Sequence, residues 1–226
     1  MCLDVAPSDR VSRLASSVRL ELSALSTDDV DRRRSYTARA QASKLRTGAA
    51  SMDEFWRSLQ MRSRVRHLGP DSIDRAAQLT QKTNQFNLTL NRHSREEIRR
   101  LASDQTAICL TLELEDRFAR HGLIGLGFVV RSDDDPETGV IDTLLLSCRV
   151  IGRTAEAHML SHLSREAQKL GFSRLRGIYV PGPRNALVAD LYPKLGFVSS
   201  GNGGNCWEYD LAGSGPIESL YIADQP

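Results

Sequence analysis

Three apolar runs, separated by short polar stretches, constrain the fold of this chain more than any other feature of its sequence. The runs cover residues 107–114, 123–130 and 140–146, with Gly122 before the second and the polar stretch 132–139 before the third. Runs of this length bounded by turn residues predict β-strands, and short connections join antiparallel neighbours. The centre of the chain is therefore expected to be a meander of three antiparallel strands.

Helices and further strands are predicted on both sides of this meander. Before it, residues 85–90 alternate like a short strand, and Ser94 with Glu97 forms a capping box that begins a helix. After it, apolar residues at helical spacing predict a helix over 153–170, which Gly171 ends. The following segments predict a strand, a helix and a strand over residues 174–180, 184–195 and 205–211. The predicted fold class is α/β, with a mixed, mainly antiparallel sheet flanked by helices.

The first 80 residues differ from the rest and look helical. Ser26 is the expected N-cap of a charged helix that runs to about residue 46, and Ser51 with Glu54 forms a second capping box. Gly69-Pro70 is expected to end that second helix and to begin a third. The sequence thus predicts three regions: a helical N-terminal linker over residues 1–80, an α/β domain over 81–213 and a loose C-terminal tail over 214–226.

Composition narrows the setting and the partners. The formal net charge of the 226 residues is +2, so the total charge does not require nucleic acid as a partner. Arginine is concentrated between residues 32 and 66, and such a local basic surface suits an acidic partner. The four cysteines lack the spacing of zinc sites, and no apolar run is long enough to span a membrane. Without a signal-peptide pattern, the expected location is the reducing cytoplasm.

Two stretches carry the predicted chemistry. The first is Cys148-Arg-Val-Ile-Gly-Arg-Thr154, at the point where a predicted strand turns into a predicted helix. Backbone N–H groups at such a helix N-terminus bind phosphate groups, such as those of CoA or of a phosphopantetheine arm. The second is Asn185-Ala-Leu-Val-Ala-Asp-Leu-Tyr-Pro-Lys-Leu-Gly-Phe197, which contains Tyr192.

Both stretches resemble motifs of the GNAT acyltransferases. The family loop reads Gln/Arg-x-x-Gly-x-Gly/Ala, and Thr154 departs from it at the last small position. The resemblance implies contacts with the cofactor from Arg149, Gly152, Arg153, Thr154 and Asn185. It also implies that Tyr192 protonates the departing thiolate, which is the work of a general acid. From the residues alone, an ordinary strand-to-helix turn and a tyrosine packed at a helix end stay open as alternatives.

A closer resemblance covers nearly the whole chain. The C-terminal region of FkbH-like proteins is similar to residues 77–89, 116–118, 145–153 and 185–190, and to the earlier stretches 29–40 and 51–61. Members of that family make glyceryl-carrier-protein thioesters for polyketide and related pathways, and they normally join a HAD-type phosphatase to this GNAT-like region. The Asp-x-Asp-x-Thr loop that such a phosphatase needs does not occur in this sequence. The resemblance therefore implies an acyl carrier protein as a partner, with a separate HAD-type phosphatase or a changed activity.

Cys148 is the predicted nucleophile. The thiolate is the reactive form of cysteine, and a helix N-terminus and adjacent cations such as Arg149 and Arg153 favour it. A small residue buried at a strand end is the alternative that the residues leave open. The FkbH-like resemblance implies that this cysteine carries the acyl group as a thioester before transfer. Cys109 lies inside an apolar run and is expected in the core.

Polar residues elsewhere supply candidate ligands. The amides of Asn84, Gln85 and Asn87 can hydrogen-bond the hydroxyl groups of a small polyol acid without desolvating a charge. A turn whose side chains satisfy local backbone groups is an equal alternative. His158 and His162 lie one helical turn apart, as a metal pair does, but no third ligand is evident in the sequence. A solvated helix face is expected there, and no metal is predicted.

The sequence thus predicts an acyltransferase that loads a small, glyceryl-like acyl group onto an acyl carrier protein through Cys148, in natural-product biosynthesis. The expected cofactor is the phosphopantetheine of the carrier protein, or CoA. Two other functions stay open. One is a CoA-dependent N- or O-acetyltransferase that does not need Cys148. The other is a non-catalytic subunit that docks a carrier protein and a separate HAD-type phosphatase.

Overall fold

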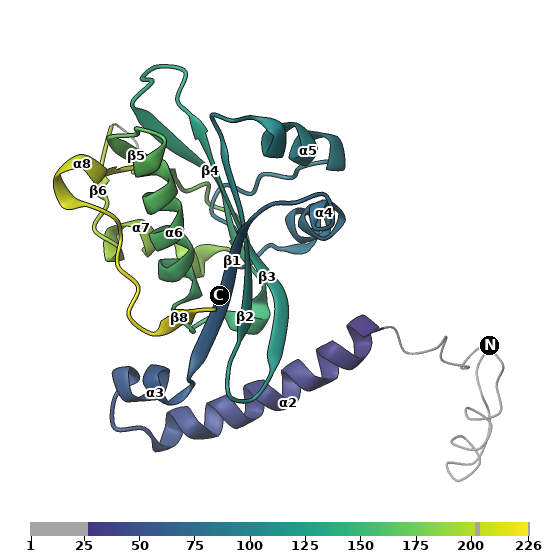
Figure 1. Cartoon of the computed structure of the whole chain (residues 1–226). Coiled ribbons are helices and arrows are strands. Elements are labelled where there is room, and N and C mark those ends of the chain that lie inside the picture. The colour runs from purple at the N-terminus through teal and green to yellow at the C-terminus, as the bar shows by residue number, and fades with distance from the viewer. Residues whose placement is uncertain (1–26, 202–203, 226) are drawn as a thin grey trace, which may run out of the picture.

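A single sheet with helices on both faces forms the centre of the molecule (Figure 1). The structure, a computed structural model, describes residues 27–201 and 204–225, and for residues 27–36 and 39 it describes the backbone alone. Within these ranges the strands lie in the order β6-β7-β5-β4-β3-β2-β1-β8. The predicted α/β class is confirmed, with a mixed, mainly antiparallel sheet.

The strands are β1 (Met61–His67), β2 (Ile108–Glu115), β3 (Arg120–Arg131), β4 (Thr138–Leu146), β5 (Arg174–Ile178), β6 (Val198–Ser199), β7 (Cys206–Asp210) and β8 (Ile222–Asp224). The helices are α2 (Thr27–Gly48), α3 (Met52–Ser58), α4 (Ile73–Lys82), α5 (Arg95–Ser103), α6 (Ala155–Lys169), α7 (Leu191–Lys194) and α8 (Leu211–Ser214). Two short 3-10 turns complete the order, η2 (Cys148–Val150) and η3 (Ala186–Val188).

The predicted meander is confirmed as β2, β3 and β4. β3 pairs antiparallel with both neighbours, so that Gly127 lies opposite Leu110 on one side and Leu144 on the other. The neighbouring side chains of Leu112 and Ile124 are fully buried. These strands therefore form the buried centre of the sheet, as their apolar sequences require.

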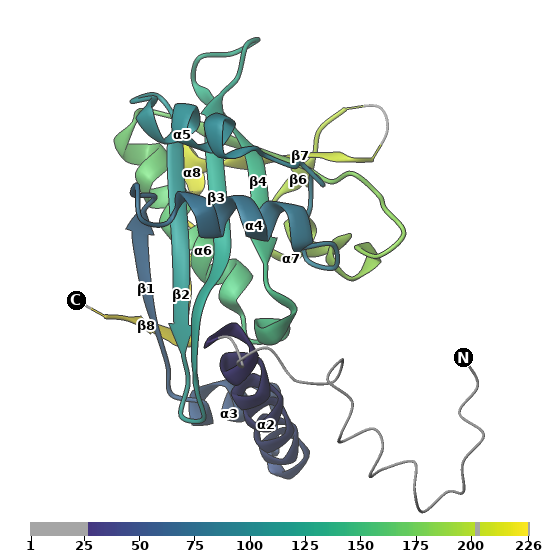
Figure 2. The same ribbon diagram turned by 90° about the vertical axis from the view of Figure 1, so that its right-hand side faces the viewer.

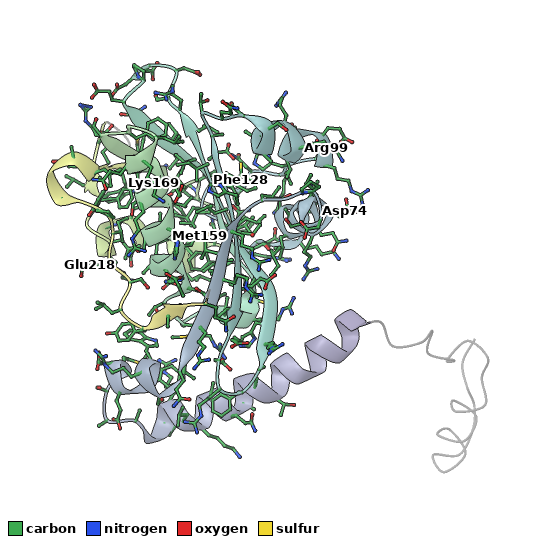
Figure 3. The ribbon with its side chains drawn as sticks, viewed as in Figure 1. Asp74, Arg99, Phe128, Met159, Lys169 and Glu218 are labelled. Carbon is green, nitrogen blue, oxygen red and sulfur yellow. The ribbon has the colours of Figure 1, made fainter. Side chains whose placement is uncertain are left out.

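Helix α6 covers one face of the sheet, and α4 with α5 covers the other (Figures 1 and 2). Met159 and Leu163 of α6 pack so closely over Gly127 that a Cβ there would lie 2.7 Å from Leu163 Cδ1. The side chain of the next residue, Phe128, instead belongs to a separate buried apolar cluster that includes Ile98 of α5. Figure 3 labels Met159 and Phe128, which represent these two layers. Alternation along β3 thus supplies both layers from one strand.

Residues 61–67 form a strand, so the prediction that the first 80 residues are helical is wrong there. Met61 and Ser63 are buried and Arg62 is exposed, which is the alternation of a strand with one covered face. β1 pairs antiparallel with β2, with Val65 opposite Leu112. β1 precedes the predicted domain boundary between residues 80 and 81, and β2 follows it. The boundary would therefore divide two strands that pair in one sheet.

The C-terminal tail also joins the sheet, contrary to the prediction of a loose end. Ile222 pairs in parallel with Met61, and Asp224 pairs with Ser63. Residues 85–90, predicted as a strand, instead make one isolated antiparallel bridge, between Asn87 and Leu145.

The helix boundaries follow the predicted caps with local exceptions. The capping box at Ser94 is formed and begins α5. α4 begins at Ile73, after Pro70 rather than at it. The helix predicted over 184–195 is divided into η3 and α7. Ser26, the predicted N-cap of the first helix, lies outside the described residues. In the described ranges, no helix combines the length and the apolar character that crossing a membrane requires.

Candidate active site at the carboxyl end of strand β4

Strands β4 and β5 separate toward their carboxyl ends, and residues 85–90 lie between them. The two strands pair in parallel only from Thr138 with Arg174 to Ile141 with Gly177. Beyond that point, residues 85–90, here called the wedge segment, bind both sides through backbone hydrogen bonds. The bonds run from Leu88 N to Leu144 O (3.2 Å), from Leu146 N to Phe86 O (3.0 Å) and from Val180 N to Leu88 O (2.8 Å). The edge of β4 is therefore already paired next to the predicted active site.

Asn185 fixes the wedge segment from the side of β5. Its Nδ2 donates to the backbone oxygens of Asn87 (2.9 Å) and Val180 (3.0 Å), and its Oδ1 accepts from Gly182 N (2.8 Å). The side chain is fully buried. Because both amide hydrogens and the amide oxygen are engaged, Asn185 contributes by holding two segments together, and the predicted contact with a cofactor would require these bonds to open.

The three predicted substrate amides have different environments. Asn87 is fully buried, and its Oδ1 accepts from Leu90 N (3.0 Å), which is the local backbone role that the sequence left open. Asn84 Oδ1 accepts from the guanidinium of Arg92. Gln85 is exposed. The carbonyl of the next residue, Phe86, accepts from Leu146 N (3.0 Å), two residues before Cys148. Gln85 therefore lies in the part of the wedge segment next to the end of β4, from which the Cys148 loop continues.

Cys148 is the exposed cysteine among the three that the structure describes. Cys109 is buried in the core, as predicted, and burial raises the pKa of its thiol to about 12. Cys148 opens η2, directly after the end of β4. Residues 147–154, here called the Cys148 loop, are anchored by the buried Val150 and by Trp56 of α3, whose Nε1 donates to Gly152 O (3.0 Å). The thiol is thus open to solvent on an anchored turn.

A buried cluster of Asp116, His121 and Arg153, here called the Asp116 cluster, anchors the Cys148 loop. Asp116 Oδ2 accepts from His121 Nε2 (3.0 Å) and from Arg153 Nε (3.0 Å). Arg153 also donates through Nη1 to the backbone oxygen of Arg149 (3.0 Å), next to Cys148. Burial acts to raise the pKa of Asp116, but the His121 hydrogen bond, backbone N–H groups and the charge of Arg153 together lower it to about 2.

This cluster changes what the arginines of the loop can do. Arg153 is almost fully buried against Asp116, so the predicted contact with a cofactor phosphate would require a buried ion pair to open. Arg149 lies beside Ser147 Oγ (3.3 Å from Nε) and the His121 carbonyl (3.5 Å from Nη1). The sequence missed Asp116 as the partner of Arg153, because the two residues are far apart along the chain.

The start of α6 is open to an anion. Thr154 has a left-handed backbone (φ 58°), and its hydroxyl donates to the carbonyl of Arg153 (2.6 Å) instead of capping the helix. Gly152 is also left-handed (φ 81°), and a Cβ there would meet nothing within 4 Å. Thr154 therefore leaves the N-terminus of α6 without a cap from its own side chain, and backbone N–H groups at such a terminus are candidates for phosphate binding.

Tyr192, the predicted general acid, is a core residue. It is fully buried, and its ring packs 4.9 Å from that of Phe197 and against Gly177, where a Cβ would collide with it. The hydroxyl lies near the backbone of Ile178 without a hydrogen bond of standard geometry in the described part of the chain. Burial raises the pKa of Tyr192. This environment fits the packing role that the sequence left open, and proton donation stays a prediction.

Glu156 is a group that the sequence did not single out. It lies in the first turn of α6, directly after the Cys148 loop, and its Oε2 is buried without a hydrogen bond to the described residues. Burial raises the pKa of Glu156. A carboxyl in this environment favours the neutral form, which can give up a proton during a reaction. No spacing in the sequence marks this burial.

Comparison with solved structures identifies proteins of similar fold. The sequence matches no family profile and no curated protein. Among solved structures, a Desulfovibrio desulfuricans protein assigned to the GNAT family of acetyltransferases is similar, with a TM-score of 0.52 and 11% identity over 67% of this chain and 99% of that one. A Methanocaldococcus jannaschii domain has a TM-score of 0.51 and 14% identity over 67% and 99%. The PaiA N-acetyltransferase from Thermoplasma acidophilum, solved with coenzyme A, has a TM-score of 0.50 and 14% identity over 66% and 98%. At these identities the likeness shows a GNAT-type fold.

Proposed function

We propose that this protein is an acyltransferase that holds an acyl group on Cys148 and passes it to the phosphopantetheine thiol of an acyl carrier protein. The observation that carries the proposal is the exposed thiol of Cys148 on an anchored turn at the end of β4, beside an uncapped helix N-terminus. The GNAT-type fold supports an acyl-transfer reaction, and the resemblance to FkbH-like proteins supports a small, glyceryl-like acyl group.

The reaction consists of two exchanges at one carbonyl carbon. Cys148 Sγ, as the thiolate, attacks the carbonyl of an activated acid, so that a C–S bond forms and the leaving group departs with its electron pair. The phosphopantetheine thiol then loses its proton and attacks the same carbon. Cys148 departs as the thiolate and is free for the next cycle. Backbone N–H groups of the Cys148 loop are the candidate donors to the oxyanion.

The wedge segment supports transfer through Cys148 over direct transfer from CoA lying along the sheet. A pantetheine arm carries two amides and can pair with a free strand edge as an added strand does. Here Leu144 and Leu146 already bind Leu88 and Phe86. The arm therefore reaches the site from the open end, where Cys148 is exposed, and the uncapped N-terminus of α6 is available to its phosphate.

The wedge segment supplies a polar side chain for the substrate. The exposed amide of Gln85, in the wedge segment next to the end of β4, supplies a donor and an acceptor for the hydroxyls of a three-carbon acid. An acid that still carries a phosphate would need a phosphatase. Since the Asp-x-Asp-x-Thr motif does not occur in this sequence, we assign that step to a HAD-type phosphatase outside it.

A carrier-protein transfer assay tests the proposal. Wild type, Cys148→Ala and Cys206→Ala are each given an acyl thioester donor and a holo carrier protein, and acylation of the carrier is followed by mass spectrometry. We expect Cys148→Ala to lose transfer by at least about 1000-fold and Cys206→Ala, a change at a half-buried cysteine elsewhere, to retain it.

The same assay separates the alternatives. Transfer from acetyl-CoA that is unaffected by Cys148→Ala would contradict the proposal and identify a direct CoA-dependent acetyltransferase. No transfer by wild type, together with stable co-purification of a phosphatase and a carrier protein, would identify a docking subunit instead.

A further inference from the structure

Three side chains with metal-binding atoms converge on the face of the sheet that α6 covers. His158 and His162 lie on α6, and Asp224 lies on β8. One nitrogen of each histidine and one oxygen of Asp224 lie within 4.8 Å of one another. We call these residues the His-His-Asp cluster. The histidine pair was visible in the sequence, but its third member enters only because the C-terminal segment forms a strand.

The fold holds the three side chains together from two directions. His158 and His162 share one face of α6, being one turn apart, and their rings lie 4.8 Å apart. β8 pairs in parallel with β1, and this pairing places Asp224 beside Ser63. Asp224 Oδ1 lies 3.2 Å from Nε2 of His158 and 3.0 Å from Nε2 of His162. Both imidazoles therefore face the same carboxylate oxygen with the same kind of ring nitrogen.

Ser219 orients the first imidazole. Its Oγ lies 2.9 Å from Nδ1 of His158; in the tautomer that a metal ligand requires, Nδ1–H donates to Ser219 and the Nε2 lone pair faces the cluster. This is the arrangement of a metal-bound histidine, in which the second ring nitrogen donates to a neighbouring group. Ser63 does not form a hydrolytic triad with His158 and Asp224, because its Oγ (2.6 Å) and Asp224 Oδ1 (3.2 Å) both lie on Nε2 of His158.

In the described part of the chain, the ion pairs of Asp224 are with histidines, His158 and His162, and not with an arginine or a lysine. The Asp116 cluster differs, because Arg153 supplies a fixed positive charge there. A bound cation would place a permanent positive charge directly beside the Asp224 carboxylate, as Arg153 does beside Asp116.

We propose that His158, His162 and Asp224 bind a divalent transition-metal ion, with Zn²⁺ as the best match. Tetrahedral zinc with bonds of about 2.0–2.1 Å places its ligand atoms about 3.3 Å apart. The two His–Asp distances are 3.2 and 3.0 Å, and all three ligand atoms lie within 4.8 Å of one another before an ion draws them together. Two imidazoles and one carboxylate form a known zinc ligand set, with water in the fourth position. Asp224 is 53% exposed, so the fourth position is open to water.

The ion would tie the C-terminal strand to α6. β8 is an edge strand, separated from β4 by β1, β2 and β3 in the sheet, so this site is distinct from the Cys148 loop. A bound zinc ion would link β8, the last described strand, to α6, the helix that follows the Cys148 loop. Its main effect is therefore on the stability of the C-terminal segment.

Zinc titration of the untagged full chain tests this site. The protein is stripped with a chelator, and zinc uptake is measured by calorimetry and by metal analysis after desalting. We expect one zinc per chain, with a dissociation constant below roughly 10 µM. His162→Ala and Asp224→Asn should each weaken binding by at least about 100-fold, and Ser219→Ala by about 10-fold. Zinc should raise the melting temperature of wild type and not that of His162→Ala.

His67→Ala is the matched control. His67 faces Glu166 of α6 at 3.6 Å, forming an exposed histidine–carboxylate pair without a second histidine, and its removal should leave zinc binding unchanged. Circular dichroism checks that His162→Ala and Asp224→Asn are folded. The proposal is overturned if wild type retains no zinc after desalting, or if all variants retain as much as wild type does.

Discussion

The Cys148 loop and the wedge segment meet at the end of β4, but they are held in different ways. The loop is anchored by side chains, namely those of the Asp116 cluster and of Trp56. The wedge segment is anchored by backbone hydrogen bonds to β4 and to Val180, with Asn185 across them. The loop therefore keeps a reactive thiol exposed on a fixed base, whereas the wedge segment closes a gap in the sheet.

This difference assigns the two regions separate roles: the Cys148 loop carries the reactive thiol, and the wedge segment shapes the space around it. An exposed group on an anchored turn can react without rearrangement of the core. A segment whose backbone groups are paired on both sides defines the space around that group and contributes few free groups of its own, with Gln85 as the exception. If this division holds, damage to the loop anchor lowers stability most, damage to the wedge segment alters stability and transfer together, and changes in the core behind the site matter least.

The largest loss of stability is expected from Asp116→Asn. This change leaves Arg153 as a buried charge without its carboxylate, which costs about 3–5 kcal/mol in the free energy of unfolding. Urea denaturation measures it. Asp53→Asn is the control, because Asp53 forms an exposed pair with Arg57, and its loss should be indistinguishable from wild type. An equally small effect at both positions would show that the loop does not depend on the cluster.

The dependence of the free energy of unfolding on pH tests the same anchor, the Asp116 cluster. The folded-state pKa of Asp116 is about 2, below its ordinary value near 3.8. Its contribution to stability is therefore fully present above about pH 4 and is lost as the pH falls toward 2. Over this window wild type should lose roughly 2 kcal/mol more than Asp116→Asn does, as measured by urea denaturation at each pH. Parallel pH profiles for the two proteins would contradict this assignment.

A smaller loss is expected from Asn185→Ala, which breaks the side-chain link across the wedge segment. It leaves the backbone oxygens of Asn87 and Val180 without a partner, at a cost of about 2–3 kcal/mol. Transfer should fall while alkylation of Cys148 by iodoacetamide proceeds at the wild-type rate, because the thiol is held by the other anchor. The exposed Asn205 gives a control in Asn205→Ala. A change in the alkylation rate would show that the two regions are not independent.

The smallest effect is expected from Tyr192→Phe. The hydroxyl is buried without a standard hydrogen bond in the described chain, so its removal should alter the free energy of unfolding by no more than about 1 kcal/mol. Transfer should stay within about 2-fold of wild type. A loss of transfer of about 100-fold or more would instead show that Tyr192 is the general acid.

The sequence predicted the parts of this molecule that rest on local patterns. The meander follows from three apolar runs, and the helix after Cys148 follows from its apolar spacing. β1 was missed because Ser63 stands at a buried position between arginines, so that the alternation of a strand looked like a charged helix. β8 was missed because three residues carry little pattern, and its partner lies far away in the sequence.

The site shows the same limit. Cys148 and the loop around it could be found from the sequence, because a strand-to-helix turn is a local feature. The pairing of Arg153 with Asp116, and of His158 with Asp224, could not, because each depends on strands brought together by the whole sheet. Burial decides whether Asn185 and Tyr192 can contact a ligand, and neither spacing nor residue type reveals it.

The most direct test of the central claim is the location of the acyl group on the protein. Wild type and Cys148→Ala are incubated with an activated acyl donor without carrier protein, and intact mass is measured before peptide mapping. A single acyl adduct on wild type, mapped to Cys148, lost on addition of holo carrier protein and not formed by Cys148→Ala, is the predicted result. An adduct that persists on Cys148→Ala, or that maps to Cys109 or Cys206, would contradict it.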